Sequence, residues 1–93
     1  MLKHNNYFEG RVQSIGFERN GRSHTVGAIS PGEFHFDTDG AERMTVTSGE
    51  LSIRFPGSAS WVLYPAGTAF EIGAKSRFDV RADAAAAYHC EFL

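Results

Sequence analysis

Three side chains in the middle of the chain have the types and the spacing of a metal-ligand set. His35 and Asp37 lie two residues apart, and Glu42 follows shortly before Gly49. In an extended strand, alternate side chains point to the same side, so His35 and Asp37 can converge. Imidazole and carboxylate groups of this kind are ligands for Fe, Mn or Zn. The position that would complete the set is Phe70, which follows Pro65-Ala66-Gly67 and cannot ligate a metal.

This spacing resembles that of the small cupin barrels, which are best known for holding a metal through histidines and a glutamate. Here Asp37 stands where a second histidine would, and Phe70 stands where the last one would. Both replacements weaken metal binding, so we predict a cupin scaffold that holds no metal. The plainer interpretations are that His35 and Asp37 are solvated residues of an edge strand, that Glu42 belongs to a turn, and that Phe70 is core.

The elements around these residues are predicted to be short β-strands. Gly, Pro, Asn and Asp divide the chain into short runs with period-two alternation, and helical periodicity is nearly absent. One segment, residues 84–87, is ambiguous because alanine favours helix, but it is too short to form one alone. We expect an all-β cupin, a small barrel or jelly-roll-like sandwich of eight or nine strands: 7–17, 24–30, 33–38, 43–48, 51–55, 61–64, 68–72, 77–82 and 84–93.

Length and charge narrow the class of protein. Ninety-three residues are enough for one domain, predicted to span 1–93. The net charge of −2 leaves no broad basic field, so neither nucleic acid nor a membrane is expected as a partner. The single cysteine, Cys90, excludes an intrachain disulfide, and residues 1–6 lack the apolar stretch of a signal peptide. We therefore predict a cytoplasmic protein.

Three segments in order resemble one particular family. They are YFEGRVQSIGF at 7–17, ERMTVTSG at 42–49 and YHCEFL at 88–93. The chain is similar along its whole length to the small single-domain cupins known as pyrimidine/purine nucleoside phosphorylases. The resemblance implies a pentosyltransferase that converts purine and pyrimidine nucleosides and phosphate to free base and pentose 1-phosphate. It also implies a homodimer that needs no metal or other cofactor, with inorganic phosphate as co-substrate.

That chemistry calls for particular groups, which we assign to individual residues. Cleavage at C1′ gives the sugar oxocarbenium character, which a carboxylate stabilises, and Glu42 is the candidate. Phosphate calls for a guanidinium, and Arg22 beside Ser23 is the first choice. His35, like Tyr88, is a candidate to protonate the departing base. Aromatic side chains stack on any base, so we also expect substrate contacts from a further set: Phe36, Phe70, Tyr88 and Phe92, together with Asp37. Arg43 and Arg77 are second choices for phosphate.

Two other functions stay open on the sequence. A non-enzymatic cupin that binds a small sugar-like ligand would explain the missing metal ligand equally well. Release of free base from a nucleoside incubated with phosphate would reject this alternative. A metal-dependent oxygenase or isomerase with a reduced ligand set is the second alternative. Stoichiometric iron or manganese in the purified protein would support that class.

Overall fold

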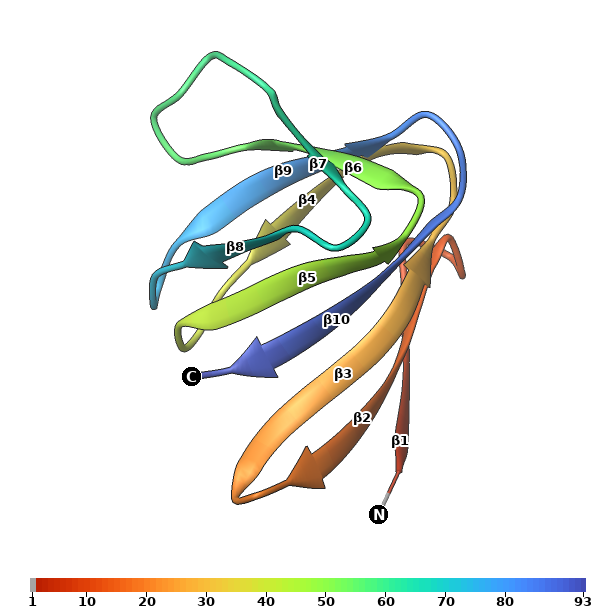
Figure 1. The fold of residues 1–93 in the computed structure, drawn as a ribbon, viewed down its shortest axis with the longest axis vertical. Coiled ribbons are helices and arrows are strands. Elements are labelled where there is room, and N and C mark those ends of the chain that lie inside the picture. The colour runs from red at the N-terminus through yellow and green to blue at the C-terminus, as the bar shows by residue number, and fades with distance from the viewer. Residues whose placement is uncertain (1) are drawn as a thin grey trace.

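A computed structural model describes residues 2–93, which form ten β-strands and no helix. Figure 1 shows the chain from its red N-terminus to its blue C-terminus. The all-β prediction is therefore confirmed. The strands are β1 (Lys3–Tyr7), β2 (Val12–Arg19), β3 (Arg22–Ile29), β4 (Gly32–Asp37), β5 (Glu42–Ser48), β6 (Glu50–Arg54), β7 (Val62–Pro65), β8 (Ala69–Ile72), β9 (Arg77–Ala82) and β10 (Ala86–Phe92).

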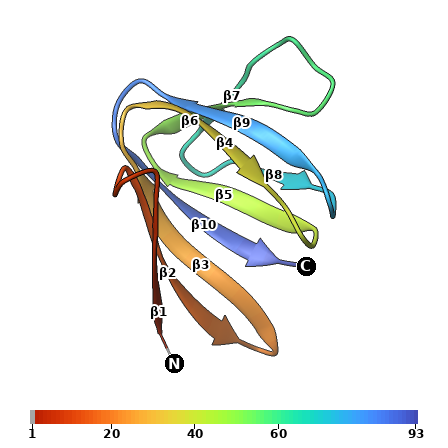
Figure 2. The ribbon, with the colours of Figure 1, turned by 180° about the vertical axis from the view of Figure 1, so that it is seen from behind.

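The strands form two antiparallel sheets that face each other (Figures 1 and 2). One sheet has six strands in the order β1-β2-β3-β10-β5-β8, and the other has four in the order β4-β9-β6-β7. The core lies between them, and its most deeply buried side chains come from both sheets: Val12, Ile29, Val46, Leu51, Ile53 and Val80. No helix within residues 2–93 has the length and apolarity needed to cross a membrane.

Alternation along the strands decides which side chains enter this core. In β6, Leu51 and Ile53 are fully buried, whereas Ser52 and Arg54 point away from the partner sheet. The turn between β2 and β3 has φ of 53° at Asn20 and 75° at Gly21, so both positions are left-handed as the Asn-Gly pair predicts. In the ambiguous alanine segment, Ala84 and Ala85 precede β10 and Ala86 and Ala87 begin it, so the segment is not helical and leads into the strand, which starts two residues later than predicted.

The prediction of one strand over 7–17 is wrong. Phe8 and Glu9 have φ of 53° and 58°, and the amide of Gly10 donates to the carbonyl of Tyr7 at 3.2 Å. The chain therefore reverses here, and Phe8 does not share a strand face with Val12. The polar segment before the turn forms β1, which pairs along its whole length with β2. This strand is why there are ten strands rather than eight or nine.

Candidate functional site

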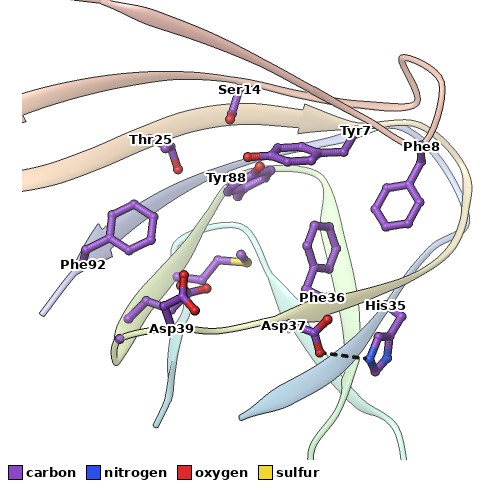
Figure 3. A pocket seen from close by; sticks show the side chains of 13 residues that line it. Tyr7, Phe8, Ser14, Thr25, His35, Phe36, Asp37, Asp39, Tyr88 and Phe92 are labelled. Carbon is purple, nitrogen blue, oxygen red and sulfur yellow. Dashed lines mark ion pairs between the residues drawn. The ribbon is translucent and has the colours of Figure 1, made fainter. Parts of the chain in front are cut away.

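A pocket of about 480 Å³ opens between the six-stranded sheet and the edge strand β4. Figure 3 shows Phe8 and Phe36 at one end and Thr25 and Phe92 at the other, with the two tyrosines between them. The described residues that line it come from β1 to β5 and β10 and from two turns: Tyr7, Phe8, Ser14, Thr25, His35, Phe36, Asp37, Asp39, Gly40, Glu42, Met44, Tyr88 and Phe92.

Glu42 is the half-buried carboxylate of this pocket. It starts β5, in which Met44 and Val46 on the same face are buried in the core, so its side chain points to the concave side of the sheet. Burial raises the pKa of the Glu42 carboxyl, and the neighbouring Cys90 thiol opposes that rise. A carboxylate that has lost part of its water interacts more strongly with a nearby positive charge than one in bulk solvent. Glu42 is thus a pocket-lining residue.

Tyr88 forms the buried part of the pocket floor. Its side chain is 6% exposed, and burial raises the pKa of the phenol to about 12, although a hydrogen bond with Ser14 opposes the shift. Ser14 also accepts a hydrogen bond from the Asn5 amide at 3.3 Å. The phenol is therefore a neutral hydrogen-bonding group at physiological pH, fixed by neighbours on two strands.

Cys90 lies beside Tyr88 on the same face and is 3% exposed. Burial raises the pKa of its thiol to about 12, and the Glu42 carboxylate acts in the same direction. A thiol of this kind is not ionised near neutral pH, so Cys90 has the properties of a packing residue and not of a nucleophile.

Phe8 is a site residue that the sequence did not reveal. Its ring centroid lies 5.1 Å from that of Phe34 and 5.6 Å from that of Phe36, which closes one end of the pocket with aromatic surface. A bulky residue with positive φ is a genuine outlier and persists only where its surroundings hold it. The Glu9-Gly10 pair that follows was the available signal for a turn at this position.

His35 and Asp37 lie at the exposed rim, on the other side of β4 from Phe34 and Phe36. His35 Nδ1 lies 2.8 Å from Asp79 Oδ1, and His35 Nε2 lies 3.4 Å from Asp37 Oδ1. The Arg54 guanidinium donates two hydrogen bonds to Asp79, at 3.0 and 2.8 Å.

The hydrogen bond to Asp79 raises the pKa of His35, and the same bond is the main cause that lowers the pKa of Asp79. His35 therefore belongs to a charged network on the outer face of the four-stranded sheet. Within residues 2–93 no three His, Cys, Asp or Glu side chains are grouped so that they could hold a metal ion. The imidazole does not converge with Glu42.

Three predicted contact residues lie away from the pocket. Phe70 is 6% exposed and packs against Tyr64, with ring centroids 4.8 Å apart, so it occupies the core. Arg22 lies at the β2–β3 turn, with its Nε 3.8 Å from Glu91 Oε2. The Arg43 guanidinium donates to Glu71 at 2.8 Å on the outer face of the large sheet.

Arg77, the remaining second choice, pairs with Asp37 in register but does not line the pocket. None of the described residues that line the pocket is a lysine or an arginine.

Comparison with known proteins identifies the family. The sequence profile of the pyrimidine/purine nucleoside phosphorylase family matches residues 2–92. A protein of that name from Sorangium cellulosum is 66% identical over 93 residues, which cover 100% of both chains. The chain belongs to this family. As a pyrimidine/purine nucleoside phosphorylase family member, it has relatives of the same name and full coverage in other bacteria, such as Vibrio vulnificus at 47% identity.

Solved structures agree with the fold of this family member. A protein of unknown function from Vibrio parahaemolyticus superposes with a TM-score of 0.97 at 41% identity, covering 100% of this chain and 99% of that one. A cupin superfamily protein from Desulfitobacterium hafniense superposes with a TM-score of 0.74, covering 98% and 82% of the two chains. Its identity is only 11%, so this likeness concerns the fold alone, which is that of a cupin.

Proposed function

We propose that this chain is a nucleoside phosphorylase that cleaves purine and pyrimidine nucleosides with inorganic phosphate in the pocket around Glu42. The observation that carries the proposal is a partly desolvated carboxylate, Glu42, in the lining of a cavity that has an aromatic end. Family membership supports the same reaction class. The reaction is a pentosyl transfer without a metal or other cofactor, because the charge that develops on the sugar can be stabilised by protein groups alone.

In this proposal the base stacks at the aromatic end, against the pocket-facing surface of the Phe8 and Phe36 rings. Stacking tolerates different bases because each has a π-face, which accounts for activity on both purines and pyrimidines. Few polar side chains reach this end, apart from His35 and Asp37 at its rim. His35 reaches the pocket only at its rim, so it is the candidate to hydrogen-bond or protonate the part of the departing base that extends past Phe36 to the edge of β4, and its bond to Asp79 raises its pKa.

The ribose then lies over Glu42 and Tyr88. As the bond from C1′ to the base nitrogen breaks, its electron pair leaves with the base and positive charge develops on the sugar. The Glu42 carboxylate stabilises that charge and accepts hydrogen bonds from ribose hydroxyls, while the neutral Tyr88 phenol donates one. A phosphate oxygen forms the new bond to C1′ on the face opposite the base, and the base takes up a proton.

The proposal also covers the setting in which the enzyme works. We propose the cytoplasm as its location, since the only cysteine is reduced and buried. The assembly proposed from the family is a homodimer. Sedimentation of the purified chain at several concentrations measures that assembly directly.

The reaction is tested by incubating the purified chain with uridine or adenosine, with and without phosphate. We expect free base and pentose 1-phosphate to appear only when phosphate is present. Glu42→Gln should lower kcat/KM by about 100-fold or more, which is the usual cost of losing a charge that stabilises a transition state. The matched control is Glu71→Gln, a carboxylate on the neighbouring strand that points outward to Arg43 and should leave the rate unchanged.

If free base is released at the same rate without phosphate, the reaction is hydrolysis of the nucleoside and not phosphorolysis. Binding of nucleoside without any release of base would favour the sugar-binding alternative. Equal rates for the Glu42→Gln variant and wild type would remove Glu42 from the mechanism.

A further inference from the structure

A second recess adjoins the pocket at the end away from Phe8 and Phe36. It has a volume of about 360 Å³ and shares Tyr7, Thr25 and Phe92 with the first pocket, so the two form one continuous depression on the concave side of the large sheet. Its other walls come from β1, β2 and β3, which lie side by side in Figures 1 and 2.

The floor of this recess is open because Gly16 has no side chain. Gly16 pairs with Lys3 on one side and with Thr25 on the other. A Cβ at this position would have the Lys3 carbonyl oxygen at 3.7 Å and the Asn5 amide nitrogen at 3.8 Å, which is ordinary contact. A side chain at position 16 would therefore fit against β1 without displacing it, and it would occupy part of the recess.

The groups around this space are mainly hydrogen-bond donors. The register places Lys3 and Asn5 on the face that looks toward the partner sheet, since Asn5 donates to the buried Ser14. Ser23 and Thr25 present hydroxyls from β3 on the same side. Lys3 takes part in none of the ion pairs found within residues 2–93. An ammonium group, an amide and two hydroxyls are a donor set suited to a phosphate group.

The first pocket lacks a set of positively charged hydrogen-bond donors of this kind. Its described lining offers carboxylates at Asp37, Asp39 and Glu42 but no lysine or arginine, so on its own it would repel a phosphate dianion. Displacement at C1′ also requires phosphate on the side of the sugar opposite the base. With the base at Phe8 and Phe36, that side is the end at Thr25 and Phe92 where the recess begins.

We propose that the recess around Gly16 is the phosphate subsite, in which Lys3 supplies the charge and Asn5, Ser23 and Thr25 supply further donors. This inference rests on the proposed phosphorolysis, but binding of inorganic phosphate tests it without that reaction. The Glu18 carboxylate also borders the recess and repels an anion, whereas the Lys3 ammonium attracts it. The two side chains should therefore have opposite effects on phosphate affinity.

The test uses Lys3→Met, which keeps most of the stem and removes the charge. Without nucleoside, titration of inorganic phosphate followed by ³¹P NMR or calorimetry should show affinity weakened by about tenfold or more, the cost of one charge-assisted hydrogen bond. The KM for phosphate should rise by a similar factor, while the KM for uridine changes little. Lys3→Arg should restore much of the binding, and Lys75→Met, the other lysine, should have no effect.

Two further variants separate loss of charge from loss of space. Gly16→Val fills the recess without changing charge and should also abolish phosphate binding, with thermal unfolding used to verify that it folds. Glu18→Gln should strengthen phosphate binding. Wild-type phosphate affinity in both Lys3→Met and Gly16→Val would overturn the subsite, even where phosphorolysis persists. Lys3-dependent phosphate binding by a chain that cleaves no nucleoside would support the subsite and reject the proposed function.

Discussion

Glu42 shows how one residue connects stability with the proposed chemistry. The motif predicted its importance, but only the fold explains its properties, because burial against β10 raises the pKa of its carboxyl. Consider an acidic group whose pKa is higher in the folded state than in the unfolded state. Its contribution to the stability of the fold is fully present at pH values below its unfolded-state pKa. That contribution is lost as pH rises through the folded pKa. At neutral pH the ionised carboxylate is therefore held at a cost to stability.

Replacing Glu42 by Gln should remove that cost. We expect the melting temperature of Glu42→Gln to exceed that of wild type by a few degrees at pH 7, and the difference to shrink toward pH 4, where wild-type Glu42 is protonated. Calorimetric melting curves across this pH range measure the effect. Glu71→Gln, which loses an exposed pair with Arg43, should not gain stability. A lower melting temperature for Glu42→Gln throughout would mean that the carboxylate is a net stabiliser.

At the scale of elements, the period-two alternation that predicted strands over 33–38 and 51–55 matches the buried and exposed faces of β4 and β6, because one face of each strand is buried. β1 was not predicted. Its residues are polar, and what holds it in the sheet is backbone pairing with β2, which leaves no hydrophobic pattern to detect. The turn that precedes β2 was missed for a related reason, since Phe8 and Glu9 adopt positive φ without being glycines.

Gly27 gives an element-scale prediction about the floor of the pocket. A Cβ at Gly27 would lie 2.6 Å from the carbonyl oxygen of Gln13 and 2.7 Å from the hydroxyl of Tyr88. Gly27→Ala must push Tyr88 away from β3, so we expect a loss of about 1–3 kcal/mol, typical of overpacking. Urea unfolding measures it. The control is Gly73→Ala, which meets nothing within 4 Å and should change stability little. Equal free energies of unfolding for Gly27→Ala and wild type would show that Tyr88 moves aside freely.

At the scale of the whole molecule, the pocket exists because the sheets are different in width. The six-stranded sheet extends beyond the four-stranded one, so the smaller sheet does not cover the concave face of β2 and β3 toward the turn that joins them (Figure 1). Polar and small residues are found on this uncovered part, at Gly16 and Thr25, and on the neighbouring β1, at Asn5. The core, by contrast, is apolar where both sheets meet.

The prediction of a single domain leads to a test of cooperativity between the sheets. Each sheet has one natural probe. Trp61, the only tryptophan, packs on the small sheet, with the guanidinium carbons of Arg54 and Arg81 4.6 and 4.4 Å from its ring centroid. Cys90, the only cysteine, is buried in the large sheet. We expect urea transitions followed by Trp61 fluorescence and by brief thiol labelling of Cys90 to have one midpoint.

Two separate midpoints would mean that the sheets unfold independently and that the chain is not a single cooperative unit. Both probes are residues of the wild-type protein, so the two transitions are measured on the same chain without any substitution. Far-UV circular dichroism provides a third, global signal against which each local probe is compared.

The sequence by itself determined the all-β class, most strand faces and the family, because alternation, turn residues and motifs are local properties of the chain. It also identified Glu42 as a residue of interest. Only the tertiary structure decided which candidates share a cavity, since that depends on contacts between segments far apart in sequence. It placed Phe70 in the core and Arg22 outside the pocket, and it brought Phe8, Tyr88 and Lys3 to the concave face around Glu42.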